Sequence, residues 1–221
     1  MTHPARSAFA FTIAALAVFA TAPLQAGSHQ TAPPQVSCAT EAEADDVTAY
    51  FADNHGLPAI AAQRLGLAET VVASALPAGD AIGTDAGIFN DVWTRLTELD
   101  SALILVLKEG HVFEMRGPIP PGTPSTRSNY FNVEFPEEEA GAGDPDGFSG
   151  HLRPDLLTAI YAFKLPGEGG VPVRSLFFYG PSGNSDFGVV LAAGESEESA
   201  ANRAAFEEIW QMIAAAPRLC G

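Results

Sequence analysis

The feature that most limits the fold of this chain is a change in its sequence pattern after Asp100. From residue 41 to about residue 99 the sequence pattern is helical, whereas residues 103–192 hold short segments rich in β-branched and aromatic residues. Gly, Pro, Asn and Asp separate these segments, which are 103–107, 111–116, 130–135, 148–153, 157–165, 173–179 and 187–192. Short strands with brief turns predict a largely antiparallel sheet, with a hairpin turn at Gly180–Asn184.

Helices are predicted before and after the strands. The first group is 41–53, 58–65, 69–76 and 87–99. The last helix is 196–215, with Ser196 as its N-cap and an apolar stripe that includes Phe206 and Trp210. The predicted fold class is therefore α+β: N-terminal helices, a large antiparallel β-sheet and a C-terminal helix packed on the sheet.

The N-terminal segment has the layout of a secretory signal peptide. A cationic start precedes an apolar run of about 13 residues, Ala8 to Ala20, and small residues follow. A membrane-spanning helix needs roughly 20 apolar residues, so this run favours a cleaved signal over an anchor. We predict a signal peptide at 1–26, a flexible linker at 27–37 and a single domain at 38–221. Export places the mature protein in the periplasm, without a membrane segment.

The charge of the chain excludes one large class of partner. With 27 acidic and 11 basic residues, the formal net charge is -16. Nucleic acids and anionic lipids are bound mainly through Lys and Arg, so neither is an expected partner. The helices at 58–65 and 69–76 resemble a helix-turn-helix pair. Because only Arg64 is basic there, a DNA-binding role is not predicted for this pair. The acidic segment 134–146 is interpreted as a solvated loop, with an ion-binding loop as the alternative.

The two cysteines, Cys38 and Cys220, lie at opposite ends of the predicted domain. In an oxidising compartment, such a pair predicts a disulfide that joins the two ends of the domain. Metal binding by these two thiols is the weaker alternative, because no CxxC motif or Cys/His cluster accompanies them.

Several short motifs, in conserved order along the chain, resemble one known family. They are AAQRLGL at 61–67, IFNDVW at 88–93, GPIPPG at 117–122, YFNV at 130–133, GHLR at 150–153 and SLFF at 175–178. From about Ala61 to Trp210 the chain resembles the HutX/ChuX family of haem-utilisation carrier proteins. The resemblance implies a sheet like one half of the HemS/ChuS proteins and a carrier of haem or a related tetrapyrrole, without chemistry of its own. Some members pair, which implies a homodimer.

The resemblance also indicates candidate haem-binding residues. His151 matches the histidine of the GHLR-type motif and is the candidate ligand of the haem iron. On a strand Ser149, His151 and Arg153 would share one face, which places a propionate partner beside the ligand. Tyr130 is a second candidate ligand, and Arg174 a second propionate partner. The alternative is structural: a hydrogen-bonded histidine, a packed tyrosine and surface charges.

Other positions depart from the family pattern. Leu107 stands where the family often carries a histidine, and His111 could replace that histidine only if the local register differed. Gly188 and Ala193 stand where the family carries cationic residues. Since each lost charged hydrogen bond is worth about 1.5–3 kcal/mol, we expect haem to bind weakly, with His151 contributing most.

The sequence leaves a second function open. A divergent, non-enzymatic member could bind another apolar ligand, or a protein partner, through the same groove. No H-x-x-x-H pair, Walker loop or Rossmann glycine motif occurs in the sequence, so no enzyme is predicted.

Overall fold

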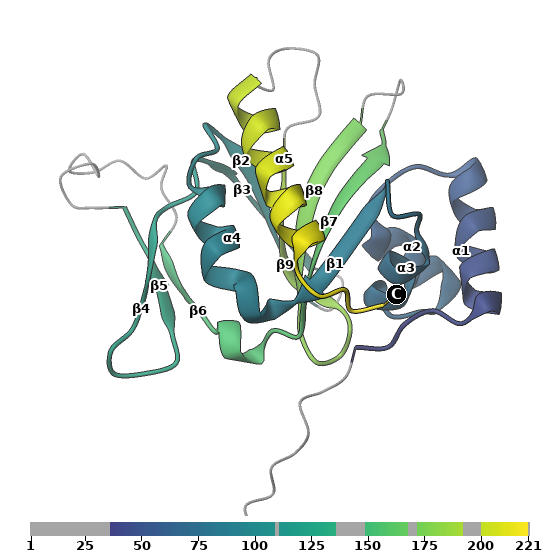
Figure 1. The fold of residues 1–221 in the computed structure, drawn as a ribbon, viewed down its shortest axis with the longest axis horizontal. Coiled ribbons are helices and arrows are strands. Elements are labelled where there is room, and N and C mark those ends of the chain that lie inside the picture. The colour runs from purple at the N-terminus through teal and green to yellow at the C-terminus, as the bar shows by residue number, and fades with distance from the viewer. Residues whose placement is uncertain (1–35, 109–110, 136–148, 168–171, 192–199, 221) are drawn as a thin grey trace, which may run out of the picture. The chain divides into compact units, whose positions relative to one another are not determined.

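A large antiparallel sheet forms the centre of the fold, as predicted (Figure 1). The computed structural model describes residues 36–108, 111–135, 149–167, 172–191 and 200–220. Six strands form the sheet in the order β1-β7-β8-β9-β2-β3, and a smaller sheet has the order β4-β5-β6. The strands are β1 (Ala81–Asp85), β2 (Ala102–Lys108), β3 (His111–Gly117), β4 (Gly122–Pro124), β5 (Phe131–Val133), β6 (Gly150–Leu152), β7 (Ala159–Pro166), β8 (Pro172–Tyr179) and β9 (Ser185–Val190).

Helices cover both faces of the large sheet. They are α1 (Glu41–Asp53), α2 (Pro58–Leu65), α3 (Glu69–Ala75), α4 (Phe89–Leu96) and α5 (Ala200–Ala215), with single 3-10 turns η1 (Ala86–Ile88) and η2 (Pro154–Leu156). The predicted bounds of α1 and α2 are confirmed, because local signals set them. A capping box of Thr40 and Glu43 begins α1, and Gly66 ends α2 with a left-handed φ of 69°.

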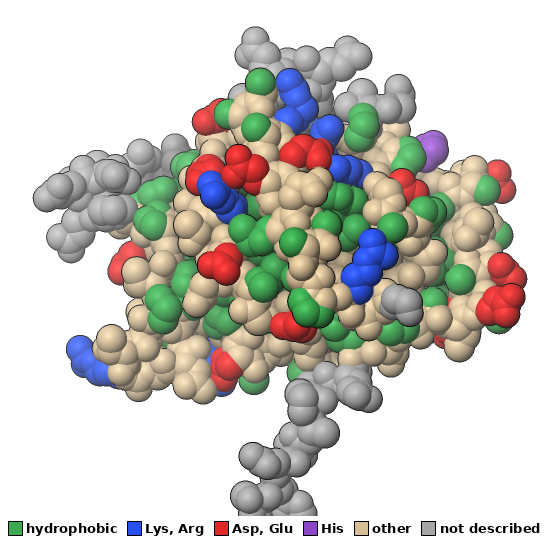
Figure 2. Space-filling view, viewed as in Figure 1, with side chains coloured by type: hydrophobic (Ala, Val, Ile, Leu, Met, Phe, Trp, Pro, Cys, Tyr) green, Lys and Arg blue, Asp and Glu red, His purple; other side chains and the backbone are tan. Residues whose placement is uncertain are grey.

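Alternating side chains of the central strands feed two separate cores. In β7, Ile160 and Ala162 face the core that α4 and α5 close, whereas Tyr161 and Phe163 face the other side, where α3 packs. Because both faces are buried, β7 is apolar almost throughout. On the face that carries α4 and α5, acidic side chains are scattered between hydrophobic ones (Figure 2).

Two strands and one helix differ from the prediction. β1 and β4 were not predicted, since β1 is short and contains Gly83, and β4 spans three residues. Both form because another strand pairs with them: the distant β7 pairs with β1, and the neighbouring β5 pairs with β4. The helix predicted at 87–99 is shorter, since η1 precedes α4 and α4 ends at Leu96.

The predicted disulfide is confirmed. Cys38 and Cys220 are joined, with a Cα–Cα distance of 5.8 Å. The hairpin turn at Gly180–Asn184 is also confirmed: it connects β8 to β9, and Gly183 has a φ of 76°.

Some predictions fall on residues that the structure does not describe. The signal peptide, residues 27–35 of the linker, the N-cap at Ser196, Ala193 and most of the acidic segment lie outside the described residues. Within the described ranges, none of the helices has the length and apolar character that a membrane crossing requires.

Candidate functional site

Three of the predicted haem-binding residues lie together on the small sheet. Its inner face carries Phe131 and Val133, which are buried in the core under α4. Asn132 and His151 are paired across β5 and β6, so both side chains lie on the outer face. We call Tyr130, Asn132, His151, Arg153 and Asp155 the outer-sheet cluster.

His151 is exposed and oriented by a neighbour. Its Nδ1 lies 2.8 Å from Oδ1 of Asn132. Because an amide oxygen only accepts, Nδ1 is the donor in this contact, and Nε2 is the ring nitrogen left for a metal. Histidines that bind metals in proteins are commonly held in this way through the other ring nitrogen. His151 therefore has the chemistry of a ligand, on an open surface.

Arg153 belongs to the same cluster but is already paired. Its Nε and a terminal nitrogen each donate to a carboxylate oxygen of Asp155 at 2.7 Å, and the guanidinium lies 5.5 Å from the centre of the Tyr130 ring. The Tyr130 and His151 rings are 5.7 Å apart. The Arg153 hydrogen bonds lower the pKa of Asp155 to about 2. The prediction that Ser149, His151 and Arg153 share one face of a strand is wrong, because β6 (Gly150–Leu152) contains only His151 of these three residues.

Arg174 does not join this cluster. It lies on β8 opposite Lys164 of β7, whereas η2 leads into the other end of β7, near Ala159. Five residues of strand separate Ala159 from Lys164, which is roughly 16 Å at 3.3 Å per residue. The structure therefore does not bring Arg174 and Arg153 to one propionate-binding surface.

A groove lies on the face of the large sheet where α3 packs, opposite to the face that carries α4 and α5. The helices α1–α3 leave β2 and β3 partly uncovered there. Its first cavity has a volume of about 480 Å³ and lies between the α1–α2 loop and the sheet. The cavity is lined by His55, Gly56, Leu57, Leu103, Leu105, Glu114, Leu165, Pro166, Gly167, Val173, Ser175 and Val190.

A second cavity of about 500 Å³ follows along the same two walls, with Leu107 and Val112 on the sheet side. Its other lining residues are Ala59, Ile60, Ala62, Gln63, Gly66, Leu67, Glu69, Lys108, His111, Asn184 and Ser185. We call the two cavities together the helix–sheet groove. Each has a volume in the usual range of small-molecule pockets, roughly 300–1,000 Å³.

The groove has an apolar wall and a histidine in each cavity. Leu103, Leu105 and Leu107 alternate along β2 and form a continuous strip on the groove side. His55 lines the first cavity, and His111 lines the second together with Leu107. The register of β2 and β3 pairs His111 with Lys108 and Leu107 with Val112, so the shift that would place His111 at the position of Leu107 is absent from this strand pair.

His55 was missed by the sequence analysis. The pair His55-Gly56 was interpreted only as the end of a helix, and Gly56 does adopt a φ of 134° there. Nothing in the local pattern shows that this loop faces strands more than 45 residues later, because the contact forms only in the folded chain.

Charges of both signs border the second cavity. Glu69 is almost fully buried, and Oγ of Ser185 donates to its Oε2 at 2.6 Å. Burial raises the pKa of Glu69, while the hydrogen bond with Ser185 opposes that rise. Lys108 supplies a cation at the same cavity. The groove therefore suits a ligand with a large apolar body and a metal or polar group that histidine can bind.

Comparison with known proteins identifies the family of this chain. The family model described as haem utilisation ChuX/HutX matches residues 84–209, which is more than half of the 221 residues. A search of curated proteins found no significant match.

Three solved structures have the same fold. The haem-binding protein ChuX is 18% identical, with a TM-score of 0.62, and the match covers 78% of this chain and 99% of ChuX. A protein from Agrobacterium tumefaciens is 25% identical, with a TM-score of 0.60 and coverage of 78% and 92%. ChuS, an Escherichia coli haem oxygenase, is 13% identical, with a TM-score of 0.59; the match covers 81% of this chain and 50% of ChuS.

Proposed function

The chain belongs to the ChuX/HutX family of haem utilisation, and we propose that it is a carrier that binds haem or a related tetrapyrrole in the helix–sheet groove. His55 is the proposed ligand of the haem iron. The similar protein ChuX is a haem-binding protein, which supports the ligand class.

The observation that carries this proposal is that Leu103 and Leu105 of β2 line the same cavity of about 480 Å³ as His55. A porphyrin needs an apolar surface for its ring and an axial ligand for its iron, and histidine is a common one. The outer-sheet cluster offers a histidine and a tyrosine, but His151 is exposed and pairs with the half-buried, polar Asn132 on the outer face of the small sheet. The groove therefore fits the group better.

The charges of the groove predict weak binding. Lys108 can attract a propionate, but Glu69 and Glu114 also line the groove. A dissociation constant of about 1 μM or weaker corresponds to roughly 8 kcal/mol of binding free energy or less. We expect a value in that range.

A haem titration followed at the Soret band tests the site. His55→Ala should reduce the spectral shift and weaken binding about tenfold or more, because it removes the axial ligand. His151→Ala is the matched control, since both histidines are exposed, and should bind like the wild type. The reverse pattern would assign the haem to the outer-sheet cluster, as the sequence predicts. No shift in the wild type would favour another apolar ligand or a protein partner.

The proposal that the protein is a carrier needs its own test, because ChuS is an oxygenase. The haem complex is incubated with ascorbate in air. A carrier keeps its Soret band, whereas an oxygenase loses it and releases an open-chain tetrapyrrole.

We further propose that the mature protein is periplasmic and begins at Gly27. The disulfide between Cys38 and Cys220 supports export, since such bonds persist in oxidising compartments. The intact mass of protein recovered from the periplasm should correspond to residues 27–221, and a mass that includes residues 1–26 would contradict the cleavage.

A homodimer is also part of the proposal. β3 is an edge strand of the large sheet, and its Val112 and Phe113 are 54% and 62% exposed. An uncovered edge strand with apolar side chains favours pairing with another chain. Light scattering should give twice the mass of the chain for the wild type, and one chain mass for Phe113→Glu; a monomeric wild type would contradict the proposal.

A further inference from the structure

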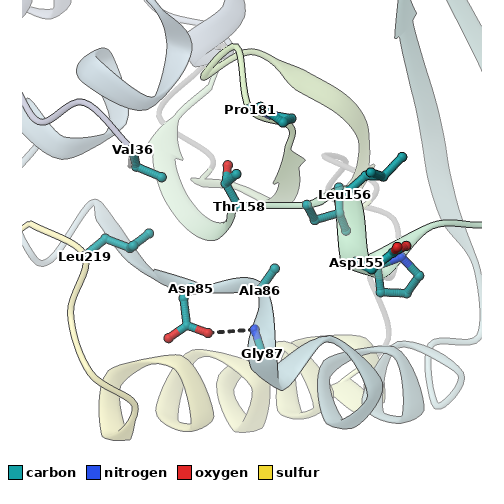
Figure 3. Close-up of a pocket in the computed structure, with 11 residues that line it drawn as sticks. Val36, Asp85, Ala86, Gly87, Asp155, Leu156, Thr158, Pro181 and Leu219 are labelled. Atoms are coloured by element: carbon teal, nitrogen blue, oxygen red, sulfur yellow. Dashed lines mark hydrogen bonds between the residues drawn. The ribbon is translucent and has the colours of Figure 1, made fainter. Parts of the chain in front are cut away.

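A third cavity shares no lining residue with the helix–sheet groove and is lined from both ends of the domain, from η1 and η2 and from the β8–β9 turn (Figure 3). Its volume is about 760 Å³. It is lined by Val36, Asp85, Ala86, Gly87, Pro154, Asp155, Leu156, Leu157, Thr158, Pro181 and Leu219. We call it the terminal cavity.

The disulfide forms part of the support for this cavity. Val36 and Leu219 are close in sequence to Cys38 and Cys220, so the cross-link holds both apolar side chains on one side. Figure 3 shows Leu156 across the cavity from these two residues. Leu156 is 50% exposed, so a large apolar side chain remains at the rim, in contact with solvent.

Several polar groups of the wall are already bonded within the protein. The Gly87 amide donates to Oδ1 of Asp85 at 2.7 Å, and the amides of Leu156 and Leu157 donate to carbonyls of η2 and its cap. The Thr158 hydroxyl donates to the Gly180 carbonyl at 3.0 Å. A ligand that enters here gains apolar contact and few hydrogen bonds.

The charges around the terminal cavity disfavour an anionic ligand. Two carboxylates, Asp85 and Asp155, belong to the lining, and no Lys or Arg does among the described residues. Arg153, which precedes Pro154 of the lining, is paired with Asp155 by two hydrogen bonds. Haem, with two propionates, is therefore a poor ligand for this site.

We infer that the terminal cavity binds an uncharged, largely hydrocarbon small molecule, and that this site is independent of the helix–sheet groove. Its walls are mostly apolar, several of its hydrogen-bonding groups are used within the protein, and the charged residues of its lining are two carboxylates, which disfavour an acid.

Two matched variants test this inference with Nile red, an uncharged apolar dye whose fluorescence rises in apolar surroundings. Leu156→Asp changes the rim of the terminal cavity, and Ile60→Asp changes the groove. The two side chains are 50% and 48% exposed, so neither change should unfold the protein. Circular dichroism checks the fold, and Leu156→Gln replaces Leu156→Asp if the charged variant does not fold.

Leu156→Asp should weaken Nile red binding roughly tenfold, since contact with a leucine side chain contributes on that order, while Ile60→Asp should bind the dye within about twofold of wild type. In a haem titration, Leu156→Asp should give the same result as wild type. This holds both if wild type binds haem and if it does not. The inference is wrong if wild type does not bind the dye, if Leu156→Asp and Leu156→Gln bind it like wild type, or if Ile60→Asp loses it.

Discussion

Removal of the Cys38–Cys220 disulfide should lower the free energy of unfolding by several kcal/mol. The bond closes a loop of sequence separation 182. In the chain-entropy relation, a loop of that length removes about 18 cal/mol/K from the unfolded chain, which is roughly 5 kcal/mol at 25 °C. For a domain of this size, such a loss lowers the melting temperature by roughly 10–20 °C.

The double variant Cys38→Ser/Cys220→Ser isolates this effect. Cys38 is exposed, and Cys220 is partly so, so serine leaves no large buried cavity at either position. The change therefore acts mainly on the unfolded chain. Urea unfolding should show a lower midpoint and a steeper denaturant dependence, because the open chain exposes more surface on unfolding.

Reduced wild-type protein is the control for the serine side chains. Its unfolding curve should coincide with that of the double variant. A difference below about 1 kcal/mol between oxidised wild type and the double variant would refute the loop-entropy reasoning, because it lies far below the value calculated for this loop.

Three further predictions concern single side chains. Burial raises the pKa of Glu69 above 4.5, so its ionisation opposes folding as pH rises through that pKa. Glu69→Gln should therefore unfold at a higher urea concentration than wild type at pH 7. The difference between the two urea midpoints should shrink at pH 4, and a difference that does not shrink contradicts this. Gly83 lies against the Tyr161 ring, so Gly83→Ala should cost about 1–3 kcal/mol in thermal unfolding, whereas Gly79→Ala, with open space around it, should be nearly neutral. NMR titration should find a pKa of about 2 for Asp155. Its ion pair with Arg153 stabilises the fold above pH 3.8, and this stabilisation is lost as pH falls through 2. A measured pKa near 3.8 would mean that the pair is absent in solution.

The sequence by itself determined the parts of this protein that depend on local signals. The bounds of α1 and α2 follow from caps and helix breakers within a few residues, and the hairpin turn at Gly180–Asn184 follows from its Gly and Pro content. The α+β class follows from the order of these local patterns, and the disulfide was predicted from two cysteines and a proposed export signal. The motif at 150–153 also indicated residues that do lie side by side with Tyr130.

The tertiary structure alone decided which distant segments face one another. β1 is a strand because β7 pairs with it, and no pattern within Ala81–Asp85 carries that information. His55 lines a cavity because the α1–α2 loop packs near β2, and Arg174 is excluded from the outer-sheet cluster because β8 carries it to the opposite end of the sheet. The physical reason is that helix caps and turns use hydrogen bonds between near neighbours, whereas a ligand cavity is the space left between elements whose apolar faces pack over long sequence separations.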